Sequence, residues 1–150
     1  MTLTHDPAPA PVAVPGAGPV GLELPERRFP LTRTALVRYA GASGDLNPIH
    51  YDEHTALRIG LPGVIAHGML TMGLAATALT DWFGPAAHVA EYETRFSRPV
   101  VVPPGEGVEL VVSGRVDAVP DGDRSRVVLT AVCGGERVLA RARAVVTAVR

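Results

Sequence analysis

Residues 64–83, VIAHGMLTMGLAATALTDWF, form the most apolar stretch of the chain and predict one long buried helix. We expect this helix to occupy residues 66–83. At about 1.5 Å per residue it is roughly 27 Å long, enough to lie across a sheet of several strands. The stretch also carries His67, three threonines and Asp81, and it is rich in alanine and glycine rather than leucine and isoleucine. A buried helix therefore fits it better than a membrane span.

The sequence after this helix predicts antiparallel strands. Runs of alternating or β-branched residues follow one another, separated by turns that contain proline and glycine. We expect strands at residues 89–96, 108–116, 126–132 and 137–149, with a shorter extended run near residues 21–30. One long helix followed by antiparallel strands predicts an α+β domain in which the sheet wraps around the helix.

Before the long helix, residues 32–60 predict two short helices joined by a bend. Thr32 or Thr34 can cap the first helix, which we expect to end at Gly41. Asp52 can cap the second. The bend between these helices holds most of the residues that could carry chemistry.

Asp45 and His50 lie five residues apart in this bend, with Pro48 between them. The residue before a proline favours extended backbone, so Asn47-Pro48 opposes helix and can aim both side chains into one pocket. Gly44 allows backbone angles that other residues avoid. An imidazole can exchange protons near neutral pH, while an aspartate beside it is normally ionised, and such a pair indicates acid–base chemistry. The alternative is that these residues only cap and turn the chain.

Two motifs, in this order, resemble those of the MaoC-like (R)-specific enoyl-thioester hydratases and (3R)-hydroxyacyl-thioester dehydratases. The residues that carry the resemblance are Tyr39, Ser43-Gly44-Asp45, Asn47-Pro48-Ile49-His50 and Ala56, followed by Ala66-His67-Gly68-Met69-Leu70. The resemblance covers roughly residues 22–148. It implies a hot-dog fold, in which an antiparallel sheet wraps around one central helix, and a homodimer or a heterodimer with a paralogous subunit.

The resemblance also implies interconversion of 2-enoyl and (3R)-hydroxyacyl thioesters, carried by coenzyme A or an acyl carrier protein. Asp45 and His50 would be the catalytic pair. The backbone N–H of Gly68, in the first turn of a helix, would bind the thioester oxygen. Supporting positions around the substrate pocket fall to Tyr39, Ser43, Gly44, Asn47, Pro48 and His67.

Two alternatives stay open. A hot-dog thioesterase would act on the same thioesters, but many such enzymes carry an acidic residue on the central helix, and nothing acidic occurs between Gly63 and Thr80. A non-catalytic acyl-binding subunit of a heterodimer would be favoured by loss of Asp45 or His50, yet both are present.

Composition excludes several other functions. All 14 basic residues are arginine, so Schiff-base, pyridoxal-phosphate and P-loop chemistry, which need a lysine amine, are excluded. We expect no cofactor. The net charge of −1 gives no sign of a nucleic-acid or membrane partner.

A metal site is not expected either. Cys133 is the single cysteine, and we predict a core thiol. His50 and His54 are four residues apart and could combine with Asp45 or Asp52, but no further ligands follow at a recognisable spacing.

Residues 1–20 contain five prolines and no lysine or arginine, which is not the pattern of a secretory signal. We expect a disordered tail rich in proline and alanine at residues 1–20, a single domain at residues 21–150, and a cytoplasmic protein.

Overall fold

The computed structural model describes residue 11 and residues 19–149, so the tail expected at residues 1–20 lies almost wholly outside the described part. The described residues form nine elements. In order they are β1 (Glu23–Leu31), α1 (Arg33–Ser43), the 3-10 helix η1 (Pro48–His50), α2 (Glu53–Arg58), α3 (Gly68–Phe83), β2 (Ala87–Phe96), β3 (Val108–Asp121), β4 (Arg124–Cys133) and β5 (Glu136–Ala148).

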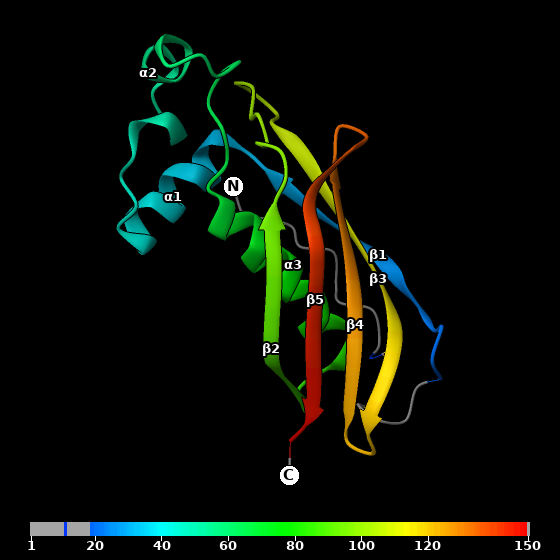
Figure 1. The fold of residues 1–150 in the computed structure, drawn as a ribbon. Helices are drawn as coiled ribbons and strands as arrows, with labels where there is room; N and C mark the ends of the chain where they lie inside the picture. Colours follow the sequence, from blue (N-terminus) through cyan, green and yellow to red (C-terminus); the bar gives the residue numbers. More distant parts are fainter. Residues whose placement is uncertain (1–10, 12–18, 150) are drawn as a thin grey trace.

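The five strands form one antiparallel sheet in the order β1-β3-β4-β5-β2. The sheet curves around α3, while α1 and α2 lie at one end of the molecule (Figure 1). This arrangement confirms the predicted α+β class and the hot-dog architecture. The strands β3, β4 and β5 are neighbours in sequence and in space, but β1 and β2 occupy opposite edges of the sheet.

The core lies between α3 and the concave face of the sheet. Small side chains on α3, such as Ala75 and Ala78, are fully buried and let the helix approach the strands closely. The fully buried Trp82 lies over Gly114 of β3, where a Cβ atom would be 2.9 Å from the indole ring. Its indole N–H donates to the carbonyl of Pro25 at 2.9 Å. The glycine in β3 therefore makes room for the largest core side chain.

Helix α3 begins two residues later than the sequence predicts. Ile65 forms a β-bridge with Val101, and the N–H of Ala66 donates to the carbonyl of Val100 at 2.8 Å. These pairings hold residues 65–66 extended, so the first helical residue is Gly68. Within residues 19–149, no helix combines the length and the apolar character needed to cross a bilayer.

The residues between β1 and α2 follow the predicted helix–bend–helix order, with one correction. Thr32 caps α1, as its hydroxyl accepts from the N–H of Ala35 at 3.2 Å. The helix passes through Gly41 and ends at Ser43, because Gly44, with φ of 75°, closes it by donating to Ala40. Asp52 caps α2 as predicted, its carboxylate accepting from His54 N–H.

We call residues 32–60 the helical segment. Its two helices are joined by an ion pair in which Arg33 of α1 contacts both carboxylate oxygens of Glu53 of α2, at 3.0 and 2.9 Å. Arg33 also donates to the carbonyl of Val102, in the chain that follows β2. Arg33 thus links α1, α2 and the loop that follows β2.

Candidate active site

A chain of short-range hydrogen bonds shapes the bend that carries Asp45. The Ser43 hydroxyl donates to the carbonyl of Tyr39 at 2.7 Å and accepts from the N–H of Asp45 at 3.2 Å. The carboxylate of Asp45 accepts from the N–H of Asn47, also at 3.2 Å. Asn47 in turn accepts from the N–H of Ile49 and caps η1. The bend is therefore more regular than predicted, because Pro48 starts a 3-10 turn in a position where its missing N–H is not needed.

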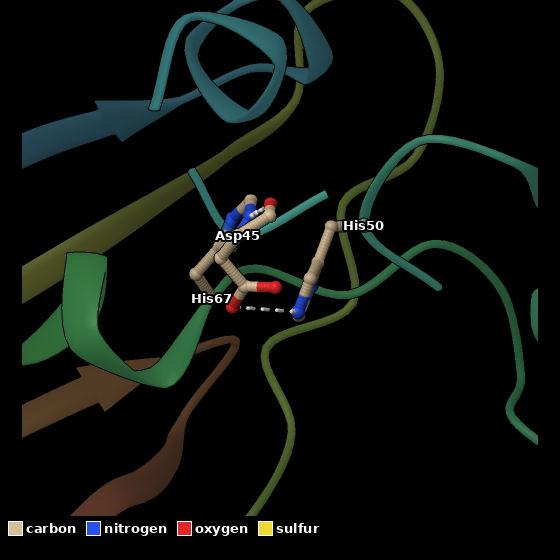
Figure 2. A group of neighbouring side chains, drawn as sticks. All are labelled: Asp45, His50 and His67. Atoms are coloured by element: carbon tan, nitrogen blue, oxygen red, sulfur yellow. Dashed lines mark hydrogen bonds and ion pairs between the residues drawn. The ribbon is translucent and has the colours of Figure 1, made fainter. Parts of the chain in front are cut away.

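The imidazole of His50 has a defined proton position. Its Nδ1 lies 2.8 Å from the carbonyl oxygen of Ile65, and a carbonyl can only accept a hydrogen bond. Nδ1 therefore carries the hydrogen, and Nε2 of the neutral ring has a free lone pair. That Nε2 faces the Asp45 carboxylate at 3.9 Å (Figure 2).

The separation of 3.9 Å is too long for a direct hydrogen bond between Asp45 and His50. It matches two acceptors that share one water, since hydrogen bonds of about 2.8 Å from the water can reach both atoms. The arrangement can thus bind and polarise a water molecule.

His67 lies behind this pair and is 1% exposed. Its ring stacks on His50, with centroids 3.7 Å apart and an angle of 22° between planes, and it meets the edge of Tyr39 at 4.9 Å. Burial lowers the pKa of His67, and so does the nearby His50, while the backbone and carboxylate of Asp45 act in the opposite direction. The net effect is a lowered pKa, which favours the neutral form of His67.

A pocket of about 340 Å³ opens beside His50. Its wall is mostly apolar, and it includes His50, Gly68, Thr71, Phe96, Val138 and Leu139. Gly68 is the first residue of α3, so its N–H has no partner within the helix. The ring of Phe96 packs on Gly68, where a Cβ atom would be 3.1 Å from it. The pocket thus joins an imidazole, a helix N-terminus and an apolar wall.

The structure separates the predicted site residues by position. His50 and Gly68 line the pocket, and the Asp45 carboxylate faces His50. The other predicted residues lie outside the pocket wall: Ser43, Gly44, Asn47 and Pro48 form the bend, and Tyr39 and His67 pack behind it. Phe96, Val138 and Leu139 could not be assigned to the site from the sequence, because they have the pattern of ordinary strand residues and reach the pocket only through the folding of the sheet.

Three side chains could offer ligands to a metal ion: Asp45, His50 and His67, whose ligand atoms lie within 4.8 Å of one another. This group differs from the pair of His50 and His54 considered from the sequence. The two stacked rings are nearly parallel, so their in-plane lone pairs cannot converge on one ion at about 2.0–2.1 Å. The arrangement therefore does not fit a metal unless a ring turns.

Cys133 ends β4, does not line the pocket, and is half-buried against the core. Burial raises the pKa of its thiol. A thiol that resists ionisation is a poor nucleophile, which agrees with the prediction that Cys133 is a core thiol.

The chain is similar to known sequences over most of its length. Residues 20–133 match the family described as MaoC like domain. The 3-hydroxybutyryl-CoA dehydratase of Methylorubrum extorquens is 36% identical over 110 residues, which cover 73% of this chain and 68% of that protein. The 3-hydroxyacyl-thioester dehydratase X of Mycobacterium tuberculosis is 35% identical over 107 residues, which cover 71% of this chain but only 35% of that longer protein.

Solved structures are similar over most of the chain. The (R)-hydratase PhaJ1 from Pseudomonas aeruginosa superposes with a TM-score of 0.79 at 28% identity, covering 90% of this chain and 85% of that one. The ChsH1–ChsH2 complex from Mycobacterium tuberculosis contains a chain that superposes with a TM-score of 0.74 at 26% identity, covering 88% and 98% respectively.

Proposed function

Since the chain belongs to the MaoC like domain family, we propose that it is a hydro-lyase that interconverts 2-enoyl and (3R)-hydroxyacyl thioesters. The single observation that carries this proposal is the 3.9 Å separation of the Asp45 carboxylate and the His50 Nε2 beside an apolar pocket. The dehydratase and (R)-hydratase names of its relatives support the same reaction and stereochemistry.

In the hydration direction, Asp45 and His50 hold one water between them. The water oxygen adds to C3 of the enoyl thioester, while the pair takes one proton from the water and returns one proton to C2. Both bonds form on the face of the substrate that is turned towards the pair. Dehydration follows the same path in reverse, and neither direction needs a covalent intermediate.

Negative charge develops on the thioester oxygen as water adds to C3. The Gly68 N–H, at the positive end of α3, is the donor that we assign to this oxygen. One such donor contributes about 3–4 kcal/mol to stabilisation of a transition state. Gly68 and His50 both line the pocket, so a thioester bound there can meet both groups.

The thioesterase alternative is less well supported. Asp81 is the only acidic residue of α3, and it lies near the end of the helix that is remote from Gly68. It is committed to a buried ion pair with Arg27 at 2.8 Å. No acidic side chain of α3 is thus available at the pocket to activate water for hydrolysis.

The assembly is also part of the proposal. The outer edge of β2 is not paired with another strand of the described residues, so it can extend the sheet into a second subunit. Either a second copy of this chain or a paralogous hot-dog subunit fits this edge, and the ChsH1–ChsH2 neighbour is by its name a complex of two different proteins. The mass of the purified assembly, measured for the protein alone and after co-expression with a paralogous hot-dog protein, distinguishes a homodimer from a heterodimer.

The function is tested by following the loss of enoyl absorbance with crotonyl-coenzyme A, longer enoyl-coenzyme A thioesters and enoyl carrier proteins. Wild type is compared with Asp45→Asn and His50→Gln. The matched controls are Asp117→Asn, on the surface of the sheet, and His54→Gln, on α2. We expect wild type and controls to form the (3R)-hydroxyacyl product. A folded wild-type protein, in its natural assembly, that hydrates none of these substrates would overturn the proposal.

A further inference from the structure

The polar contacts of His67 fix the position of its proton. Its Nε2 lies 3.2 Å from the backbone oxygen of Asp45, which can only accept a hydrogen bond. Nε2 therefore carries the hydrogen. Nδ1 is buried and has no hydrogen-bond partner among residues 19–149. A second proton would bury a charge and add an unsatisfied donor, so the ring is held neutral.

This neutral ring lies flat against the imidazole of the proposed catalytic pair. The rings of His67 and His50 are 3.7 Å apart and nearly parallel, so His67 covers one face of His50 (Figure 2). The Ile65 carbonyl holds the Nδ1 edge of His50. A cation in the place of His67 would oppose the imidazolium that His50 forms when it takes a proton. The ring of His67 limits the movement of His50 without that repulsion.

His67 also links the bend to the long helix. The other hydrogen bonds of Asp45 within the described chain are local, to Ser43 and Asn47. The bond from His67 reaches across 22 residues and joins the Asp45 backbone to the residue before Gly68. One side chain thus relates the carboxylate, the imidazole and the start of α3 to one another.

Helix capping does not account for this histidine. His67 is the N-cap residue of α3, but its side chain makes no capping hydrogen bond. An apolar side chain would fill the same buried space without the unpaired Nδ1, which costs about 1–3 kcal/mol when buried. The contacts that a histidine makes, and an apolar residue would not, are those with Asp45 and His50.

We propose that His67 is a positioning residue that holds Asp45 and His50 at the separation needed to share a water. This inference rests on the proposed hydratase function. His67 lies outside the pocket wall and does not touch substrate there, so it acts only through its two neighbours. The groups that face its ring are the Tyr39 phenol, the Asp45 backbone and carboxylate, and the His50 imidazole.

Two substitutions separate the two contacts of His67. His67→Phe keeps a stacked ring and removes the donor to Asp45, whereas His67→Gln keeps a donor and removes the ring. We expect each to lower kcat about tenfold or more while KM stays within about twofold, with His54→Gln as the matched control on the exposed helix α2. Folded variants that both keep the wild-type kcat would overturn the proposal.

A second measurement does not depend on activity. In the wild-type protein with ¹⁵N-labelled histidine, we expect His67 to carry its hydrogen on Nε2 and to stay neutral at the ordinary histidine pKa of about 6.5. We expect His50 to carry its hydrogen on Nδ1 in the wild type and in His67→Phe, because the Ile65 carbonyl fixes that tautomer. A wild-type His67 that titrates like an exposed histidine, or that carries its hydrogen on Nδ1, overturns the positioning role even in an active enzyme. Wild type without hydratase activity but with the expected spectrum overturns the proposed function alone.

Discussion

The carboxylate of Asp45 and the Nε2 of His50 are 3.9 Å apart, yet the Asp45 side chain is 52% exposed and that of His50 only 9%. The two members of the pair therefore differ in what they contribute to folding. His50 is part of the packed interior, whereas Asp45 reaches the same place from the surface of the bend.

Because the Asp45 side chain is exposed, Asp45→Asn tests its role in the reaction with little effect on folding. The asparagine side-chain oxygen can still accept from the N–H of Asn47, so the bend keeps its hydrogen bond. We expect kcat for enoyl hydration to fall by at least about 100-fold, since a carboxamide cannot exchange a proton. We expect the free energy of unfolding to change by less than about 1 kcal/mol, as for an exposed substitution. Parallel kinetics and urea unfolding check both values, and near-wild-type kcat would contradict the role of Asp45.

Gly68→Ala probes the close contact between α3 and Phe96. The added methyl group would lie 3.1 Å from the Phe96 ring, which is 49% exposed and can move aside. We expect the melting temperature to change little, and kcat/KM to fall about tenfold because the methyl group narrows the approach to the Gly68 N–H.

The matched control is Gly73→Ala on the same helix, where a Cβ atom meets nothing within 4 Å. It should leave activity unchanged and stabilise the helix by about 0.5–1 kcal/mol. Adding Phe96→Ala to Gly68→Ala should restore part of the activity if the ring forces the methyl group into the substrate path. Full activity of Gly68→Ala alone would argue against this approach to the N–H.

The ion pair of Arg27 and Asp81 ties β1 to the last turn of α3. Both side chains are nearly buried, with exposures of 8% and 12%. We expect Asp81→Ala to destabilise the protein by about 3 kcal/mol, because it leaves the arginine charge buried without this carboxylate. The surface pair of Arg126 and Asp117 is the control, and Asp117→Ala should have a much smaller effect in the same urea experiment. Equal losses from the two substitutions would contradict this assignment.

The buried histidine predicts a loss of stability in mild acid. The pKa of His67 is lowered in the folded protein, first by burial, so the unfolded chain binds a proton that the folded chain does not. The stabilisation is complete above the ordinary histidine pKa of about 6.5 and declines as the pH falls from there to the lower folded value. One proton changes the unfolding free energy by at most about 1.4 kcal/mol per pH unit.

We therefore expect His67→Gln to lose less stability than wild type between about pH 6.5 and 5. Urea unfolding at several pH values measures the two slopes. Parallel slopes for wild type and His67→Gln would contradict the lowered pKa of His67.

The parts of the fold predicted from the sequence are those governed by local physics. Thr32 and Asp52 cap helices because their side chains bond backbone N–H groups three or fewer residues away. The strands after α3 follow from alternation and from glycine turns. The predicted end of α1 at Gly41 is wrong, because glycine is tolerated within a helix. The positive φ that ends α1 occurs at Gly44.

What the sequence could not predict depends on pairing over long distances. Residues 65–66 pair with residues 100–101, and this pairing delays α3. The same limit applies to the site. Asp45 and His50 could be paired from their spacing, but the stacking of His67 on His50 brings together residues 17 positions apart, and Phe96 reaches Gly68 only because β2 ends there.

In the sequence, the helical segment, residues 32–60, lies between β1 and the β-bridge at Ile65. β1 belongs to the sheet, and Ile65 pairs with Val101, in the chain that follows β2. The pocket wall comes mainly from the sheet, from α3 and from residues 65–66 and 97–100, whereas the segment supplies the Asp45–His50 pair. Reactivity and shape are therefore separable properties of this chain. Because Asp45 is exposed and His50 is packed, replacing Asp45 alone would remove the proposed reaction and keep an apolar pocket that binds an acyl chain without converting it.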